Sequence, residues 1–169
     1  MANINGRSFI ATLKSTTHGE VLPVGYTSHA SLSDDNGWLI QSEHGQPSAK
    51  LQFDFIEDAG NRLHYHISAA PGTEYEGAKL GVSRNGYLGF YSNAKVTDFW
   101  KLELYGDDSH SELFSFVLRD ARGYRVGSVE GAAGGFWIGL GNKLPPTTRL
   151  QFLNVEEGDI VYFQARIRQ

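Results

Sequence analysis

The chain has 169 residues, no cysteine and a formal net charge of −4 at pH 7. This length suits one domain that buries a core without disulfides or a structural metal. The absence of thiols excludes zinc–thiolate sites, and the absence of a basic excess excludes nucleic acid as an expected partner.

The N-terminal sequence "MANINGRSFIATLK" lacks the charged and apolar regions of an export signal. A run of about 18 apolar residues, the minimum for a membrane-spanning helix, also does not occur. We therefore expect no membrane insertion and a cytoplasmic location. Non-classical release stays open.

The composition favours strands joined by tight turns, with 20 glycines, 8 tyrosines and 10 phenylalanines against one methionine. Along the chain, apolar residues recur with a period of two, which is typical of half-buried strands. The clearest sets are Leu51, Phe53 and Phe55; Leu63, Tyr65 and Ile67; Trp100, Leu102 and Leu104; Phe114, Phe116 and Leu118; and Val161, Phe163, Ala165 and Ile167. The sequence therefore predicts an all-β fold.

Three glycine–aromatic pairs recur at equal spacing: Gly37-Trp38, Gly86-Tyr87 and Gly135-Phe136 are separated by 49 residues in both gaps. Each pair follows a turn rich in Asp, Asn, Arg or Gly and opens a strand, although the third turn, "EGAAGG", offers few polar side chains and predicts a degenerate third site. Regular self-similarity of this kind indicates a repeated supersecondary unit. We expect a single domain over 1–169 with internal repeats at about 7–60, 61–110 and 111–160.

The strands around these pairs also match one another. The predicted opening strands are "FIATLK" (9–14), "LHYHIS" (63–68) and "FSFVLR" (114–119). The predicted closing strands are "KLQFDF" (50–55), "FWKLEL" (99–104) and "RLQFLN" (149–154), the last displaced by one residue. Four strands in each of three repeats predict twelve strands.

The segment "AKLGVSRNGYLGFYS" (78–92) resembles the hairpin of the β-trefoil superfamily, in which a leucine–glycine strand turns at Asn-Gly. The resemblance covers about residues 7–155 and concerns the fold, not one family. It implies a short closed barrel capped by three hairpins. The segment 15–29 and a surplus strand at 159–168 fit this pattern poorly, and a β-sandwich or jelly roll is the alternative.

Catalytic motifs are not found: the sequence contains no G-x-S-x-G, phosphate-binding loop, H-E-x-x-H or calcium loop. We therefore expect a protein without enzymatic activity or cofactor. His64 and His66 alternate on one strand and could bind a metal with Asp54. The favoured interpretation is that they are polar residues on a solvent face, so no metal site is predicted. The acidic residues at 156–159 are attributed to turn chemistry.

The aromatic residues of the three pairs suggest a carbohydrate platform. If Leu39, Leu88 and Trp137 face the core, the preceding aromatic residues face outward, where a ring can stack on the C–H face of a sugar. The competing interpretation, which the apolar residues of trefoil hairpins favour, is that the facing is reversed and these rings close the bottom of the barrel. The predicted carbohydrate-binding residues are Asp35, Asn36, Trp38, Arg84, Asn85, Tyr87, Asn93 and Asn142.

The leading functional hypothesis is a lectin with shallow repeated sites for glycans or glycoproteins, whose avidity comes from repetition or from homo-oligomers. The Gln-x-Trp signature of ricin-type lectins is absent, so no sugar is specified. One alternative is a protease inhibitor that acts through "GNKLPPTT" (141–148), where two prolines stiffen the loop. Another is a protein-interaction module that uses the segment 15–29.

Overall fold

The computed structural model describes residues 4–28, 37–91, 98–106, 112–132, 137–138, 142–143 and 149–168. These residues form strands, turns and bends, and no helix occurs among them. Consequently, this part of the chain contains no helix long and apolar enough to cross a membrane. The predicted all-β class is confirmed.

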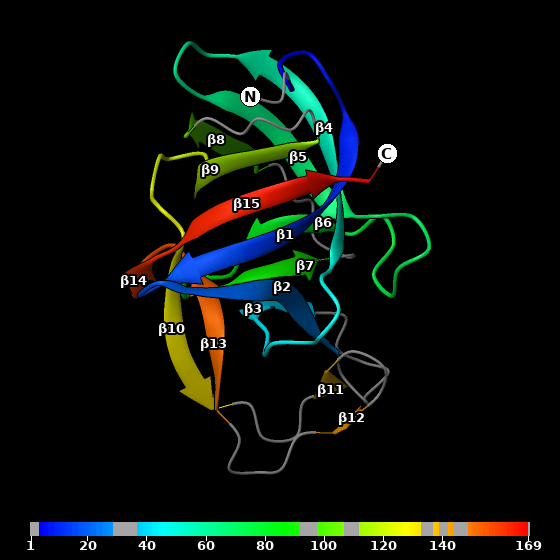
Figure 1. The fold of residues 1–169 in the computed structure, drawn as a ribbon, viewed down its shortest axis with the longest axis vertical. Helices are drawn as coiled ribbons and strands as arrows, with labels where there is room; N and C mark the ends of the chain where they lie inside the picture. Colours follow the sequence, from blue (N-terminus) through cyan, green and yellow to red (C-terminus); the bar gives the residue numbers. More distant parts are fainter. Residues whose placement is uncertain are drawn as a thin grey trace.

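The strands, shown in Figure 1, are β1 (Phe9–Thr17), β2 (Glu20–Ser28), β3 (Gly37–Gln41), β4 (Lys50–Asp58), β5 (Leu63–Ala69), β6 (Lys79–Val82), β7 (Leu88–Tyr91), β8 (Trp100–Tyr105), β9 (Leu113–Arg119), β10 (Gly127–Ala132), β11 (Trp137–Ile138), β12 (Asn142–Lys143), β13 (Arg149–Asn154), β14 (Asp159–Ile160) and β15 (Tyr162–Ile167).

Nine antiparallel strands close a barrel. Its order is β1, β15, β9, β8, β5, β6, β7, β3 and β2, and β2 pairs with β1 to complete the ring. β15, the last of these strands in the sequence, lies beside β1, the first (Figure 1). Closure leaves no free sheet edge along the ring, which removes a site of aggregation.

Further strands extend this ring. β4 pairs with both β1 and β5. β13 pairs with β3 and with β10, and β10 also pairs with β14. The short β11 pairs with β2 and β12. The β10–β13 pair therefore continues the sheet beyond β3, and it leads the chain into the loop between β13 and β14.

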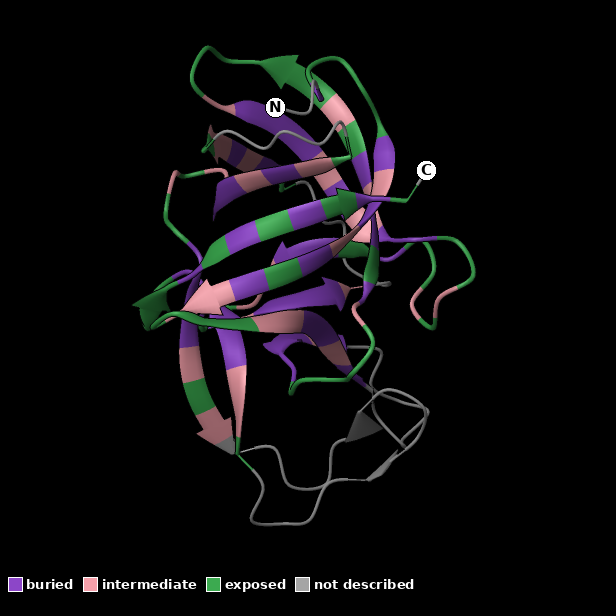
Figure 2. Cartoon of the chain, in the orientation of Figure 1, coloured by how far each residue is buried: buried purple, intermediate pink, exposed green. Residues whose placement is uncertain are grey.

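The core lies inside the barrel and follows the predicted period of two. In β5, Leu63, Tyr65 and Ile67 are buried, and β15 alternates buried and exposed residues along its length (Figure 2). The polar atoms of the buried rings have partners: Trp100 Nε1 donates to the carbonyl of Leu80 (3.0 Å), and the Tyr65 hydroxyl donates to the carbonyl of Ile4 (2.6 Å). These bonds offset the cost of burying the polar atoms.

The expected β-trefoil is wrong, because the closed barrel has nine strands and further strands outside it. The sequence predicts equivalent positions for the three closing strands, but the third, β13, pairs differently from the other two. β4 and β8 pair with β5 and β9, the strands that follow them, whereas β13 pairs with β10 and β3.

The surplus strand at 159–168 explains part of this error. Its residues include β15, which pairs with β1 and β9 and is an integral member of the ring. Alternation of apolar and polar residues determines which face of a strand points to the core, but it does not determine which strand is its neighbour in the sheet. The closed ring does not confirm the alternative β-sandwich either.

Candidate functional site

The tight turn between β6 and β7 is the feature around which the candidate site is built. Ser83 N–H donates to the carbonyl of Tyr87 (2.8 Å), and Gly86 N–H donates to the carbonyl of Ser83 (3.0 Å). Gly86 has a φ of 87°, a conformation that glycine adopts without strain. The turn thereby presents Arg84 and Asn85 to solvent, and both are exposed.

A buried amide fixes the loop after β13 against this turn. The Asn154 Nδ2 group donates to the carbonyl of Asn85 (3.0 Å), and its Oδ1 accepts from the N–H groups of Glu156 (2.7 Å) and Glu157 (3.1 Å). Val155 N–H donates to the carbonyl of Gly86 (2.9 Å). These bonds place Glu156 beside the β6–β7 turn.

The turn after β9 forms a second side of the candidate site. Asp120 is buried; its Oδ1 accepts from the N–H groups of Arg122 (3.0 Å) and Tyr124 (2.9 Å), and its Oδ2 accepts from Arg122 Nη2 (2.8 Å). The hydrogen bond to Asp120 raises the pKa of Arg122; partial burial opposes this rise, and the charges of Asp120 and Glu156 add to it. The Arg122 guanidinium also lies 4.5 Å from the centroid of the exposed Tyr124 ring.

These turns line a small open cavity, which we call the hairpin-turn cavity. Its volume is about 280 Å³, and six of its eight lining residues carry polar or charged side chains. The lining residues are Val82, Ser83, Arg84, Asp98, Asp120, Ala121, Arg122 and Glu156. Four separate segments of the chain therefore meet at one polar cavity.

Three charged side chains at this cavity are available to a ligand. Within the part of the chain that the structure describes, the side chains of Arg84, Asp98 and Glu156 make no hydrogen bond or ion pair, whereas Asp120 and Arg122 bind each other. Charged side chains are strong hydrogen-bond donors and acceptors for neutral hydroxyl groups. The cavity thus combines a fixed wall with three charged side chains that make no hydrogen bond or ion pair with a described residue.

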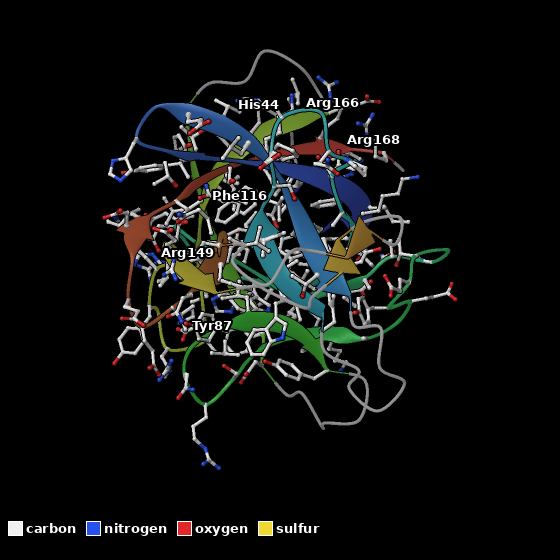
Figure 3. All side chains as sticks on the ribbon, turned by 90° about the horizontal axis from the view of Figure 1, so that it is seen from below. His44, Tyr87, Phe116, Arg149, Arg166 and Arg168 are labelled. Atoms are coloured by element: carbon white, nitrogen blue, oxygen red, sulfur yellow. The ribbon has the colours of Figure 1, made fainter. Side chains whose placement is uncertain are left out.

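The predicted platform residues Trp38 and Tyr87 lie together on the outside of the barrel. Their ring centroids are 5.3 Å apart with the planes at 82°, and Tyr87 makes a second edge contact with Phe152 at 5.9 Å. These rings pack with Ile40 in a cluster separate from the barrel core, and Trp38 and Tyr87 are only half-buried. We call this the outer aromatic cluster. In Figure 3, Tyr87 lies beside the green β6–β7 hairpin.

For two of the three pairs the structure shows the outward facing of the aromatic ring, which is not the interpretation that the sequence favoured. Leu39 and Leu88 are buried in the barrel core, and the preceding Trp38 and Tyr87 take the opposite face. Trp38 and Tyr87 therefore lie outside the barrel core. The third pair, at 135–136, lies outside the described residues.

The remaining predicted site residues are not brought together by the described structure. Asp35, Asn36 and Asn93 lie outside the described residues. Asn142 lies in β12, where only the backbone is described. Of the inhibitor-type loop at 141–148, the structure describes only the backbone of β12.

The histidine pair on β5 does not form a metal centre with the partner considered. His64 Nδ1 lies 3.0 Å from Glu57 Oε1, and Asp54 instead accepts a bond from Gln52. Among the described residues, no group of three or more histidine or carboxylate side chains is arranged to hold a metal ion. No cofactor can be placed from these residues.

Most of the cavity is not evident from the sequence. The sequence predicts Arg84 as a site residue, but it gives no such signal for Asp98 or the Asp120–Arg122 pair, and turn chemistry accounts for Glu156. The segment "DARGY" (120–124) does carry a pattern for a side-chain-capped turn, since aspartate accepts backbone N–H groups two residues on. Only the fold shows that this turn faces Arg84.

Comparison with known proteins adds no family to this description. A scan against protein-family models found no match, and searches of curated proteins and of solved structures found no similar protein.

Proposed function

We propose that this protein binds carbohydrate without chemical turnover and that the hairpin-turn cavity holds one sugar residue. The proposal rests on three charged side chains, Arg84, Asp98 and Glu156, which line a small polar cavity and make no hydrogen bond or ion pair with a described residue. The Arg84 guanidinium supplies planar hydrogen-bond donors, and the carboxylates of Asp98 and Glu156 supply hydrogen-bond acceptors. Together they match the mixed donor and acceptor character of sugar hydroxyls.

Nearby aromatic rings support the same proposal. Tyr124 is 53% exposed, and it is held by its contact with Arg122, which lines the cavity. Tyr87 belongs to the same hairpin turn as Arg84. A half-exposed ring can contact the C–H face of a sugar while polar groups bind its hydroxyls.

The test is a glycan array followed by titration calorimetry with the best ligand. Arg84→Ala is expected to weaken binding about tenfold or more, because a hydrogen bond to a charged group is worth about 1.5–3 kcal/mol. Glu156→Gln is expected to act in the same direction. Arg166→Ala is the matched control, since Arg166 is an exposed arginine on β15 that does not line the cavity.

Two results would contradict the proposal. The first is the absence of any glycan that binds the folded protein. The second is binding that survives Arg84→Ala and Glu156→Gln but is lost in Trp38→Ala, which would place the ligand on the outer aromatic cluster instead.

A further inference from the structure

A second and larger cavity lies between β2, the loop joining β3 to β4, and the turn joining β5 to β6. Its volume is about 560 Å³, within the range of small-ligand sites. Its lining differs from that of the hairpin-turn cavity, because it includes an aromatic ring, Tyr26, and a proline, Pro47. The two cavities share no residue. We call it the β2 cavity.

Backbone hydrogen bonds fix the walls of the β2 cavity. Ser42 N–H donates to the carbonyl of Pro23 (2.8 Å), and Ala49 N–H donates to the carbonyl of Val24 (2.8 Å). The loop from 42 to 49 is therefore anchored to β2 at both ends. On the other side, Gly77 N–H donates to the carbonyl of Ala69 (3.1 Å) and holds the 70–77 turn. The cavity is preformed by the fold.

Small side chains keep this space open. A Cβ atom on Gly25 would collide with Ser42 Oγ, so a larger residue there would displace the Ser42 side chain that lines the cavity. Ser42, Ser48 and Ala49 also line the cavity and occupy little of it. Larger residues at these positions would fill the volume that a ligand would otherwise take.

Tyr26 forms a fixed aromatic wall. Its ring makes edge contacts with Tyr75 (5.3 Å between centroids) and Phe90 (6.0 Å), so its orientation is set by the core. Burial, and then the charge of Glu74, raise the pKa of the Tyr26 hydroxyl. Tyr26 therefore stays neutral at physiological pH and offers an apolar ring with a hydroxyl group. Pro47 extends this apolar surface.

Two opposite charges complete the lining. The Lys50 side chain is exposed, and its ammonium makes no hydrogen bond or ion pair with any residue that the structure describes. Glu74 contributes a carboxylate to the same cavity. A carboxylate has several acceptor positions, so it can bind a ligand in addition to a protein group. The cavity thus presents one cation and one anion beside an apolar wall.

We propose that the β2 cavity binds a short apolar peptide in its zwitterionic form, with the ligand carboxylate at Lys50, its ammonium at Glu74, and its side chains against Tyr26 and Pro47. The proposal goes beyond the carbohydrate function and uses none of its residues.

Titration calorimetry of the full chain with L-leucyl-L-leucine tests the proposal. We expect heat of binding with this dipeptide and none with N-acetyl-L-leucinamide, which keeps the leucine side chain but carries neither charge. Lys50→Gln is expected to weaken dipeptide binding about tenfold, because it removes a charge-assisted hydrogen bond. Glu74→Gln is expected to weaken it as well.

Lys14→Gln is the matched control, since Lys14 is an exposed lysine on β1 that does not line the β2 cavity. Circular dichroism of each variant checks that the fold is kept. Absence of dipeptide binding at millimolar concentration, equal binding by Lys50→Gln, or equal binding of the blocked compound would each overturn the proposal. Unchanged dipeptide binding in Arg84→Ala would support a site separate from the hairpin-turn cavity, and loss of binding there would refute it.

Discussion

At the scale of single residues, one buried amide connects the folded core to the candidate site. Asn154 is fully buried, and each of its side-chain polar atoms has a partner. It also forms a bridge through its backbone with Tyr87. Because its bonds reach both the β6–β7 turn and the loop containing Glu156, the position of two cavity walls depends on this side chain.

Asn154→Ala is expected to lower the free energy of unfolding by about 2 kcal/mol, because buried N–H and C=O groups lose their partners. Urea unfolding followed by tryptophan fluorescence measures the change. Asn61→Ala, at an exposed asparagine in the turn before β5, is the control and should change stability by less than about 0.5 kcal/mol. Similar stabilities for the two variants would show that the amide does not hold the turn.

At the scale of elements, an arginine–glutamate–arginine group joins three parts of the barrel wall. Glu103 on β8 accepts from Arg62 Nε (3.2 Å), just before β5, and from Arg119 Nη2 (3.4 Å) on β9. Partial burial acts to raise the pKa of the Glu103 carboxyl, but the hydrogen bonds and charges of Arg119 and Arg62 outweigh it and lower this pKa. The carboxylate form is therefore the one that stabilises the strand contacts.

The contribution of Glu103 to stability depends on pH. Because its folded pKa lies below the unfolded value of 4.5, the stabilisation is complete above that value and is lost as the pH falls through the folded pKa. Glu103→Gln is expected to be less stable than the parent at pH 7, and the difference should shrink below about pH 4. Urea midpoints across this pH range measure it.

Glu130→Gln is the matched control for this experiment. Glu130 pairs with Arg149 at 2.8 Å, but both side chains are more than half exposed. Solvent screens such a pair, so a smaller effect is expected. A difference between Glu103→Gln and the parent that stays constant from pH 7 to pH 3 would contradict the assignment.

At the scale of the whole molecule, residues from the two ends of the described chain close the barrel. β15 lies between β1 and β9, and pairs such as Ala11 with Ile167 join positions far apart in sequence. The buried face of β15 includes Phe163, which stacks on Phe116 at 5.5 Å between centroids. Removal of β15 would expose the edges of β1 and β9 and part of the core.

Deletion of residues 159–169 is therefore expected to abolish the cooperative unfolding transition. Circular dichroism during thermal unfolding measures this, and exposure of the core should also raise binding of a hydrophobic dye. Gln164→Ala, at an outward-facing position on the same strand, should leave the transition nearly unchanged. A truncated protein that unfolds at the same midpoint would contradict the role of β15 in closure.

Parts of the candidate site could be inferred before the structure. The Asn-Gly turn predicts the hairpin that β6 and β7 form, with Arg84 and Tyr87 on it; in the structure Arg84 is exposed and Tyr87 is half-buried outside the barrel core. The other walls could not be inferred, because Asp98, Asp120 and Glu156 come from segments that only pairing between distant strands brings together. The β2 cavity was missed for the same reason.

The sequence by itself determined that this protein is all-β and which face most strand residues take. Residues such as Leu63, Tyr65 and Ile67 alternate with polar neighbours, and a strand whose side chains alternate has only one way to bury its apolar face. Only the tertiary structure decided which strands are neighbours. Strands 149–154 and 159–168 carry the same alternation as the others, yet β13 lies beside β10 and β3 while β15 closes the ring. The physical reason is that alternation of apolar and polar residues specifies which face of a strand is buried. Which strand lies next to it depends on long-range packing, which no local sequence pattern specifies.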